Sequence, residues 1–391
     1  MDKNRFDVIV VGGGIVGTTA AYFLARRGAR IALVERDRIG HGTTARSFAW
    51  INASSKIADE PYHRLNALGA SIYHDLADAF GAERLGLHRT GMLQCISRND
   101  TAGLAALEEQ VGYLGRYGYP HQVLDAQALS KLEPAVTFDD DATAIHAMSE
   151  DWLEAPEFVA FLADEIRAMG SLVLEGCATT TLDLNDDGSV SGLVTDQGTF
   201  TTTKVLIAAG HETPEVLAAL TGYEAFAARF PMNRVPGLLV TTPPCQSAEQ
   251  LRHVIYFDSP SDPFHIRPAG NGRLRMGADD TDGMIAEDTS PESIHRAAER
   301  LLGHARARLP GLIGDMTAKQ CELAIGIRPY PHDGKTLAGA LPGSQGLYLI
   351  ATHSGITLAP ALGQLMTTLI IEGTMPEALQ PFALERLPGF A

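Results

Sequence analysis

The residues best suited to chemistry lie near the start of the chain. Gly12, Gly14 and Gly17 form the pattern G-x-G-x-x-G, and the acidic residue Glu35 follows it. In this pattern the first glycine permits a tight turn, the second lets the backbone approach a pyrophosphate, and the third lets a helix pack closely on a strand. An acidic side chain at the position of Glu35 can accept hydrogen bonds from a ribose diol. These residues predict a dinucleotide site, and a glycine-rich turn without a ligand is the alternative.

The elements around this pattern can position it. Residues 7–11 form an apolar, β-branched run that predicts a buried strand, residues 18–27 have the spacing of an amphipathic helix, and residues 30–34 predict a second strand. The N-terminus of the helix offers unpaired N–H groups and the positive end of its dipole to phosphates. Ile15 and Val16 are therefore expected to contact the ligand together with the three glycines.

Three later segments are assigned to the same ligand. The polar stretch after Glu35 can offer hydroxyl, guanidinium and backbone donors to a pyrophosphate or a flavin edge, although an ordinary polar loop has a similar composition. Residues 204–210 predict a buried strand with a glycine at its tip, where the backbone can lie against a ligand or simply turn. A predicted β meander begins near residue 178. The residues assigned in these segments are Arg36, Thr43, Thr44, Arg46, Ser47, Ala178 and Gly210.

Length and composition limit the classes of function. The 391 residues suggest two domains, and 31 Lys plus Arg against 47 Asp plus Glu give a net charge of −16. Such an acidic chain is a poor candidate for binding nucleic acid or an anionic membrane. The four cysteines are scattered without a C-x-x-C pair, which favours a reducing compartment and argues against a metal site. We find no run as long as a membrane span and no signal peptide, and therefore expect a cytoplasmic protein without an integral membrane segment.

The order of predicted elements divides the chain. The N-terminal βαβ rhythm is lost from residue 87 and returns around residue 145. A second break contains the short, regularly spaced strands of residues 226–277, which are typical of an antiparallel sheet. The chain is therefore predicted to be α/β (α+β overall), with a Rossmann-like domain interrupted by a β-rich one. The later elements are predicted as a helix over 291–309, strands over 321–327 and 347–351, and a long apolar helix over 356–372.

Two C-terminal motifs make the sequence resemble a known family. They are G-I-R-P at residues 326–329 and H-S-G-I-T-L-A-P at residues 353–360. Together with the glycine pattern and the K-V-L-I-A-A-G strand, they resemble the FAD-dependent amino-acid oxidases and dehydrogenases, which include D-amino acid oxidase, glycine oxidase, sarcosine oxidase and D-amino acid dehydrogenase. The resemblance covers nearly the whole chain. It implies an FAD-binding domain of residues 1–86, 145–225 and 321–391, and a mainly antiparallel substrate domain of residues 87–144 and 226–320.

The resemblance also implies how a substrate is held. In this family an arginine in the G-x-R-P position pairs with the substrate carboxylate, and Arg328 matches it; guanidinium geometry suits such a bidentate pair. A structural pair with a nearby Asp or Glu is the alternative. His265 stands where the family usually has a tyrosine, and this departure leaves the substrate side chain open. Arg267 is assigned to the opposite face of the same strand, outside the site.

The start of the C-terminal helix is expected to contact the flavin ring. Its N–H groups would point at the flavin pyrimidine edge and stabilise negative charge on the reduced ring. His353 precedes this helix and is expected to line the pocket. Some relatives hold FAD through a cysteine near the G-x-R-P motif, but here Arg328 stands there and Cys321 lies upstream, so we expect non-covalent FAD. The cofactor residues assigned here are Gly326, Arg328, Ser354, Gly355, Ile356 and Thr357.

The implied activity is oxidation of the C–N bond of an amino acid or N-substituted amino acid. A hydride would pass from the carbon that bears the amine to flavin N5, the imine would hydrolyse, and oxygen or a quinone would accept the electrons. Arg328, His265 and His353 are assigned to catalysis, with a small carboxylate-bearing amine as the substrate and a homo-oligomer as an option. The alternatives are a flavoenzyme that oxidises a 2-hydroxy acid or related alcohol with a histidine base, an NAD-linked dehydrogenase, and a non-catalytic flavin-binding protein.

Overall fold

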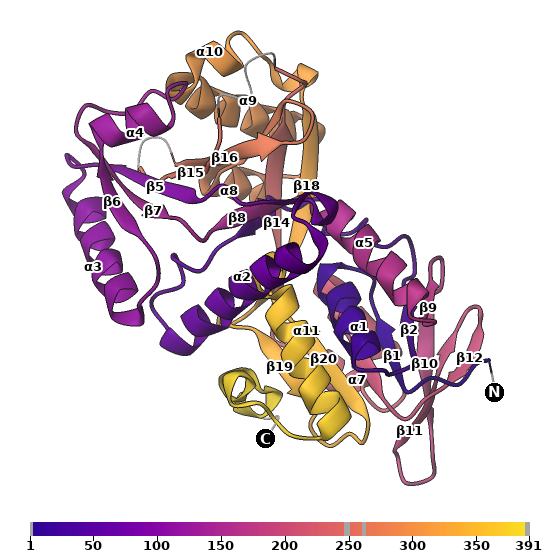
Figure 1. Ribbon diagram of the computed structural model, residues 1–391. Coiled ribbons are helices and arrows are strands. Elements are labelled where there is room, and N and C mark those ends of the chain that lie inside the picture. Colours follow the sequence, from indigo (N-terminus) through magenta and orange to yellow (C-terminus); the bar gives the residue numbers. More distant parts are fainter. Residues whose placement is uncertain (1–2, 246–250, 260–262, 388–391) are drawn as a thin grey trace.

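The computed structural model describes residues 3–245, 251–259 and 263–387, which fold around two large sheets (Figure 1). The smaller of these has six strands in the order β19-β20-β13-β1-β2-β9, all parallel to their neighbours except β19. Every residue of β1 is buried, which agrees with its apolar, β-branched sequence. The strands of this sheet are β1 (Val8–Val11), β2 (Ile31–Val34), β9 (Leu172–Leu174), β13 (Val205–Ile207), β19 (Leu337–Ala340) and β20 (Leu347–Ala351).

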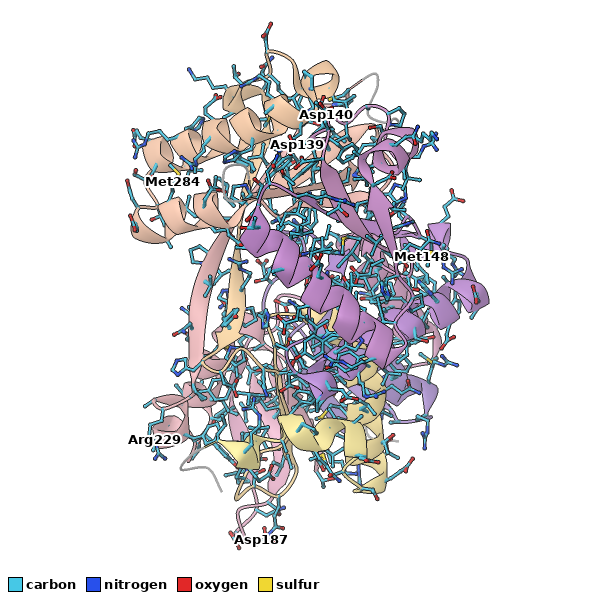
Figure 2. All side chains as sticks on the ribbon, turned by 90° about the vertical axis from the view of Figure 1, so that its left-hand side faces the viewer. Asp139, Asp140, Met148, Asp187, Arg229 and Met284 are labelled. Atoms are coloured by element: carbon cyan, nitrogen blue, oxygen red, sulfur yellow. The ribbon has the colours of Figure 1, made fainter. Side chains whose placement is uncertain are left out.

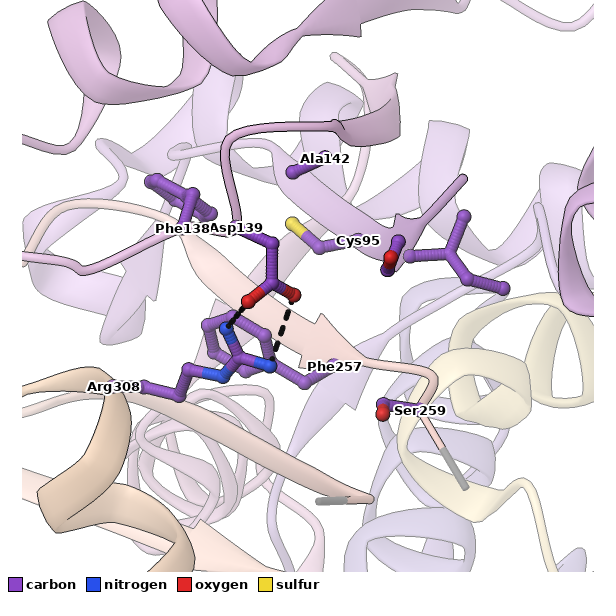
Figure 3. A pocket seen from close by; sticks show the side chains of 9 residues that line it. Cys95, Phe138, Asp139, Ala142, Phe257, Ser259 and Arg308 are labelled. Atoms are coloured by element: carbon purple, nitrogen blue, oxygen red, sulfur yellow. Dashed lines mark hydrogen bonds and ion pairs between the residues drawn. The ribbon is translucent and has the colours of Figure 1, made fainter. Parts of the chain in front are cut away.

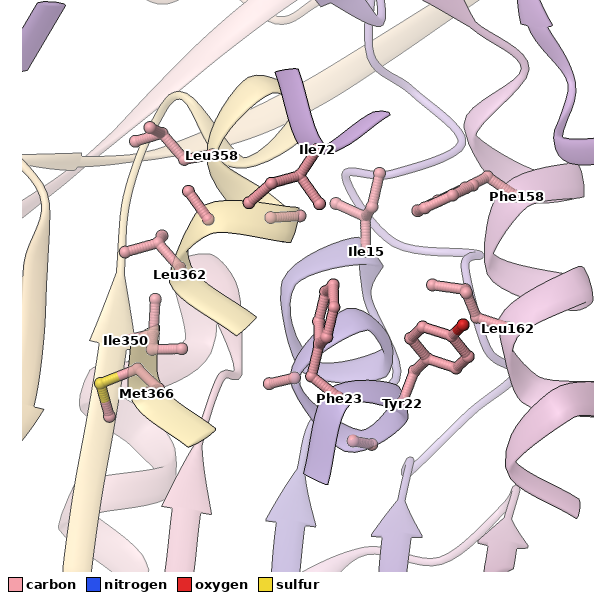
Figure 4. Packing of buried hydrophobic residues seen from close by; sticks show 14 of the residues in the cluster. Ile15, Tyr22, Phe23, Ile72, Phe158, Leu162, Ile350, Leu358, Leu362 and Met366 are labelled. Carbon is pink, nitrogen blue, oxygen red and sulfur yellow. The ribbon is translucent and has the colours of Figure 1, made fainter. Parts of the chain in front are cut away.

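Four helices share one hydrophobic cluster with this sheet, as Figure 4 shows around Phe23, Ile72, Phe158 and Leu362. They are α1 (Ile15–Arg26), α2 (Glu60–Phe80), α5 (Ala155–Ala168) and α11 (Gly355–Glu372). Helices α11 and α1 lie so close that a Cβ on Gly363 would meet Phe23 Cδ2 at 2.9 Å. Helix α11 is long and apolar enough to cross a membrane by length and composition, so the expectation that no run reaches that length is wrong. Most of this helix is buried within the cluster, which is how a core helix behaves.

The other face of the six-stranded sheet packs against a small antiparallel sheet and two short helices. The strands are β10 (Thr179–Leu184), β11 (Val190–Thr195) and β12 (Gly198–Thr201), and the helices are α6 (Thr213–Ala219) and α7 (Glu224–Ala227). Figure 2 shows Asp187 at the tip of the β10–β11 hairpin, far from Met284 of the second domain. Parallel strands enclosed on both faces give the Rossmann-like domain that the sequence predicts.

The second domain is built on an eight-stranded sheet in the order β18-β14-β17-β16-β15-β5-β7-β6. Its pairs are antiparallel except for β5 and β15, so the expectation of a mainly antiparallel domain is confirmed. One face of the sheet packs with α9 in a separate hydrophobic cluster. The strands are β5 (Met92–Ser97), β6 (Gln122–Asp125), β7 (Ala142–Ala147), β14 (Met232–Thr241), β15 (Val254–Phe257), β16 (Phe264–Ala269), β17 (Arg273–Gly277) and β18 (Glu322–Pro331), and the helices are α3 (Thr101–Tyr117), α4 (Ala126–Leu132), α8 (Asp279–Glu287), α9 (Pro291–Arg308) and α10 (Pro310–Ile313).

The predicted domain boundaries at residues 145 and 321 differ from the sheet membership of two strands. Residue 145 falls inside β7, and β18, which begins at Glu322, belongs to the eight-stranded sheet. Strand β18 also continues past the predicted end at residue 327, because it pairs with β14 over ten residues. Pro329 is tolerated there because β18 is an edge strand. A small sheet of β3 (Trp50–Ile51), β8 (Asp151–Leu153) and β4 (Leu87–His88) completes the described strands.

Candidate active site

The carboxyl ends of β1, β2, β13 and β20 meet at one edge of the six-stranded sheet. The chain leaves β1 toward β2 on one side, while β13 pairs on the other, so the order of connection reverses between β1 and β13. Ligands of open α/β sheets bind in the crevice at such a point. The residues predicted to bind the cofactor follow these four strand ends: the glycine pattern follows β1, Glu35 follows β2, Gly210 follows β13, and Ser354–Thr357 follow β20.

The three glycines have different surroundings. Gly12 has φ +108°, and a Cβ there would lie 2.5 Å from the carbonyl oxygen of Ala208. A Cβ on Gly17 would lie 2.0 Å from the carbonyl oxygen of Gly12, so both glycines are required by the fold itself. A Cβ on Gly14 would meet only Thr44 Oγ1, at an ordinary 3.4 Å. Gly14 therefore leaves open space at the N-terminus of α1, where a pyrophosphate is predicted.

The acidic residue and the first polar residues lie beside this helix terminus. The Gly13 N–H donates to Glu35 Oε2 at 2.7 Å, and the Asp37 N–H donates to Oε1 at 2.9 Å. The Ile15 N–H donates to Thr44 Oγ1 at 3.0 Å. Both predicted residues thus lie at the N-terminus of α1, where the pyrophosphate and ribose are predicted.

The N-termini of α1 and α11 lie side by side. A Cβ on Gly355 would come within 3.2 Å of Val16 Cγ2, so the positive ends of two helix dipoles converge on one place. The side chains of this turn are held by the protein: Thr357 Oγ1 accepts from the Asn52 N–H at 3.0 Å, and Ser354 Oγ accepts from the Tyr62 hydroxyl at 2.9 Å. The carbonyl of Ile356 accepts from the Tyr73 hydroxyl. The first-turn N–H groups of α11, rather than its hydroxyls, are therefore the groups suited to a flavin.

The polar loop and the G-I-R-P motif are in direct contact, although they are far apart in the chain. Thr43 Oγ1 donates to the carbonyl of Ile327 at 2.7 Å, and a Cβ on Gly326 would lie 2.1 Å from the carbonyl oxygen of Arg46. The carbonyl of Ser47 accepts from Arg275 Nη1 at 3.2 Å. An open cleft of about 520 Å³ borders this contact and is lined by His41, Ala45, Arg46, Ile294, Glu322, Leu323, Ala324 and Ile325.

Three further cofactor predictions have different outcomes in the structure. Gly210 adopts φ +58° at the tip after β13, as its predicted turn requires. Arg36 forms an ion pair with Glu212 and is well exposed. The N–H and C=O of Ala178 both bond to Asp196, at 2.9 and 3.0 Å, so its backbone pairs across the open end of the β10–β11 hairpin. The assignment of Ala178 to the cofactor stays a prediction.

Arg328 has a partner in the protein. Its Nη2 donates to Asp282 Oδ2 at 2.8 Å and to the carbonyl of Pro236 at 3.3 Å, while its buried Nε finds no hydrogen-bond partner among the described residues. The Arg328 side chain is nevertheless 38% exposed, whereas Asp282 is 13% exposed. Burial raises the pKa of Asp282 to about 6, although the positive charge of Arg328 opposes the rise. The arginine is thus held by one nitrogen and keeps an open side for a ligand.

Four rings form an aromatic wall beside this arginine. His265 lies 4.3 Å from Phe48, Phe48 lies 6.5 Å from Trp50, Trp50 lies 6.4 Å from Tyr256, and Tyr256 lies 6.5 Å from His265, each distance being between ring centroids. Burial, reinforced by the nearby positive Arg328, lowers the pKa of His265 to about 4. His265 is therefore neutral at pH 7. Such a ring is able to accept a proton or a hydrogen bond.

His353 also lines this region. Its ring centroid lies 4.4 Å from that of Tyr330, and its buried Nδ1 lacks a hydrogen-bond partner among the described residues. Burial, together with the positive charges of Lys56 and Arg328, lowers its pKa to about 4. Arg328 therefore acts electrostatically on both His265 and His353, and their assignment to a common pocket stays a prediction.

The assignment of Arg267 to the opposite face of β16 is wrong. Residues two apart on a strand share a face, and His265 and Arg267 both contact Phe48. Arg267 is fully buried, lies over the ring of Trp152 at 4.4 Å, and donates to the carbonyls of Phe48 and Pro268. Burial lowers its pKa to about 9. It supports the aromatic wall from within the protein.

Two acidic residues of this region were missed by sequence reasoning. Asp282 carries the signal of an acidic first turn, A-D-D-T-D, but nothing local relates it to Arg328. The carboxylate of Glu150 is fully buried and accepts from the N–H groups of Ala53 and Ser54 at 2.9 and 2.5 Å. The Asn52 amide and the Trp50 indole donate to it as well, at 3.1 and 3.2 Å. Glu150 thereby fixes the segment that carries Trp50 of the aromatic wall.

A small cavity elsewhere does not compete as a substrate site. It measures about 10 Å³, enough for about one water molecule. Figure 3 shows that Arg308 and Asp139 fill it with a bidentate ion pair, at 2.9 and 3.2 Å. Among the residues that the structure describes, no three His, Cys, Asp or Glu side chains gather as a metal site.

Comparison with known proteins decides the family. The family described as DAO, FAD dependent oxidoreductase, matches residues 7–369. The chain belongs to this family. It is 27% identical to glycine oxidase from Geobacillus kaustophilus over 415 aligned positions, which cover 99% of this chain and 98% of that one. It is also 27% identical to glycine oxidase from Bacillus licheniformis, with 98% of each chain covered.

Solved structures show the same fold. The crystal structure of glycine oxidase from Geobacillus kaustophilus superposes with a TM-score of 0.81 at 24% identity, covering 99% of this chain and all of the other. L-amino acid deaminase from Proteus vulgaris gives a TM-score of 0.81 at 18% identity, covering 98% and 94%. The protein is accordingly an FAD-dependent oxidoreductase. The open space at Gly14 and the converging helix termini are features that suit FAD.

Proposed function

We propose that this enzyme oxidises the C–N bond of a small amino acid or N-substituted amino acid that carries a free carboxylate. The observation that supports this most is the side chain of Arg328, which is fixed through Nη2 and open to solvent on its other side. A guanidinium held in this way is suited to a charge-assisted pair with a carboxylate. FAD supplies the hydride acceptor and is proposed to be bound non-covalently.

The residues of the chain orient and enclose the substrate in this proposal. Arg328 holds the carboxylate, and this fixes the direction of the adjacent C–H bond, an orientation effect. The aromatic wall of Phe48, Trp50, Tyr256 and His265 shields the reacting carbon from water. Because lone-pair donation from a neutral amine assists loss of the hydride, the protein has no need of a strong base.

Oxidation of a 2-hydroxy acid is the second candidate, and one observation favours it. A hydroxyl must lose its proton during oxidation, and His265 and His353 are both held neutral by burial, so that either can accept one. Anaerobic reduction of the bound flavin by a panel of amino acids, N-methyl amino acids and hydroxy acids separates the two candidates. The same preparation, reoxidised by oxygen or by a quinone, identifies the electron acceptor.

The proposal is tested by Arg328→Ala and Arg328→Lys. We expect each variant to retain FAD, and we expect Arg328→Ala to raise the KM for carboxylate substrates at least about a hundredfold, because two charge-assisted hydrogen bonds are lost. Arg328→Lys keeps the positive charge but loses the bidentate guanidinium geometry, so its KM should lie between those of the wild type and Arg328→Ala. Arg300→Ala, on the outer helix α9, is the matched control. Unchanged kinetics in Arg328→Ala would contradict the proposed role.

A further inference from the structure

Asp282 is a rigidly held carboxylate beside the proposed substrate anchor. One oxygen, Oδ1, accepts from the Leu238 N–H at 2.7 Å, and the other, Oδ2, accepts from Arg328 Nη2 at 2.8 Å. Leu238 lies on β14 and Asp282 on α8, so two packed elements fix its position. Its low exposure means that a ligand arriving at Arg328 finds this carboxylate already in place.

The positive charge of Arg328 is already offset within the protein, while the nearby Lys56 interacts with Asp279 and also acts on His353. Asp282 offsets the single positive charge of the guanidinium, and His265 on the neighbouring wall is neutral. Asp279, the first residue of α8, is exposed and makes no ion pair within the part of the chain that the structure describes; its negative charge acts on both His265 and Asp282. A second carboxylate bound to the same guanidinium would therefore meet like charges nearby, and like charges in a partly buried site repel strongly.

We propose that Asp282 is a specificity-determining residue, which selects ligands whose carboxylate lies next to a positively charged amine over carboxylates without one. The inference rests on the proposed function, in which Arg328 binds the substrate carboxylate. An ammonium group one carbon away from that carboxylate lies close enough to offset the charge of Asp282. The hydroxyl of a 2-hydroxy acid provides no such compensation. Asp282 thus favours amino acids over hydroxy acids at the binding step, and the bound ammonium then releases its proton to solvent before hydride transfer, which requires the neutral amine.

Two ligands of equal shape isolate the charge. Trimethylglycine carries a permanent cation next to its carboxylate, and 3,3-dimethylbutanoate replaces the nitrogen by carbon. Neither has a hydrogen on nitrogen, so protonation of the ligand amine does not complicate the comparison. The dissociation constants of both are measured from the change in flavin absorbance of the holoenzyme at about pH 8, where Asp282 is ionised.

We expect the wild-type enzyme to prefer trimethylglycine by about tenfold or more, and Asp282→Asn to reduce this ratio by about tenfold, chiefly by binding the uncharged analogue more tightly. Asp282→Ser serves as a second variant if the amide disturbs folding. Asp280→Asn is the control on the same helix, because Asp280 pairs with Arg300 and His304 instead, and its ratio should match the wild type. A purely structural role for Asp282 would weaken both ligands alike and leave the ratio unchanged.

Three results would overturn the inference: equal ratios in the wild type and Asp282→Asn, a wild-type preference for the uncharged analogue, or no binding of either ligand by the wild type. Arg328→Ala separates these failures from failure of the proposed function. If Arg328→Ala binds both ligands as the wild type does, the carboxylate anchor is wrong. If it loses both while Asp282→Asn keeps the wild-type ratio, only the role of Asp282 is wrong.

Discussion

Replacing Gly14 by valine should yield a folded protein without FAD. Gly14 has φ −72° and ψ 176°, an extended conformation that valine adopts readily, and a Cβ there meets only Thr44 Oγ1 at 3.4 Å. The protein itself therefore has room for the first carbon of the side chain. As the N-cap of α1, a valine in place of glycine should cost at most about 1–2 kcal/mol. A side chain at this point would instead occupy the space predicted for the pyrophosphate, which glycine patterns of this kind leave free.

Gly17→Ala provides the contrast. A Cβ at Gly17 would lie 2.0 Å from the carbonyl oxygen of Gly12. Because that oxygen belongs to the backbone, no side chain can rotate to relieve the clash, and α1 must shift away from β1. Overpacking of this kind costs about 3 kcal/mol or more, a large part of a total stability of about 5–15 kcal/mol. Gly17→Ala should therefore be unstable even as apoprotein.

The assay compares the ratio of visible flavin absorbance to protein absorbance in purified variants, followed by thermal unfolding of the apoproteins. Gly14→Val should show essentially no flavin and a Tm within about 4 °C of wild-type apoprotein. Retention of one FAD per chain would refute the placement of the pyrophosphate. If Gly14→Val lost as much stability as Gly17→Ala, the claim that the apoprotein has room for a side chain at Gly14 would be refuted. The missing flavin would then result from a damaged fold.

Two further outcomes follow from buried groups. Glu150→Ala leaves several buried donors without an acceptor and should lower the free energy of unfolding by about 3–5 kcal/mol in urea titrations, with Glu150→Gln less affected. A loss below about 1 kcal/mol in Glu150→Ala would contradict the stabilising role of these hydrogen bonds. Burial holds the pKa of His265 and His353 at about 4 in the folded protein, below the unfolded value of about 6.5. As the pH falls, the unfolded chain therefore takes up protons first, so stability is kept above pH ~6.5 and declines toward pH ~4, by at most about 3 kcal/mol for each histidine. His353→Asn should make the free energy of unfolding decline less steeply between pH ~6.5 and pH ~4. An unchanged pH profile in this variant would contradict the burial of His353 as a neutral imidazole.

Local patterns carried most of the fold prediction. The apolar run of β1, the glycine turn and the spacing of α1 involve residues that are neighbours in the chain, and the helix predicted over residues 291–309 corresponds to α9. Sheet membership was harder, because β7 and β18 have ordinary strand patterns and only their partners show which sheet they join. The predicted boundaries at residues 145 and 321 differ from the sheet membership of these strands for this reason.

In the candidate site too, residues within local motifs were predictable and residues that act on distant partners were not. Arg328, His265 and His353 were assigned from motifs, whereas Asp282 and Glu150 act on residues far away in sequence. Asp282 and Arg328 are 46 positions apart, and Glu150 and Ala53 are 97 positions apart. No periodicity relates such pairs. Arg267 is a different case, because residues two apart on a strand share a face and the sequence alone therefore places Arg267 on the face of His265.

The packing of α11 against α1 has a consequence for synthesis of the protein. Arg27, at the end of α1, and Glu372, at the end of α11, form an ion pair across 345 positions of sequence. At translation rates of about 5–20 residues per second, the first helix leaves the ribosome roughly 20–70 s before its partner exists. During that interval the face of α1 that later contacts α11 has no native cover. The nascent chain is therefore a natural client for chaperones, and the nucleotide crevice takes its final shape only after the last helix has emerged.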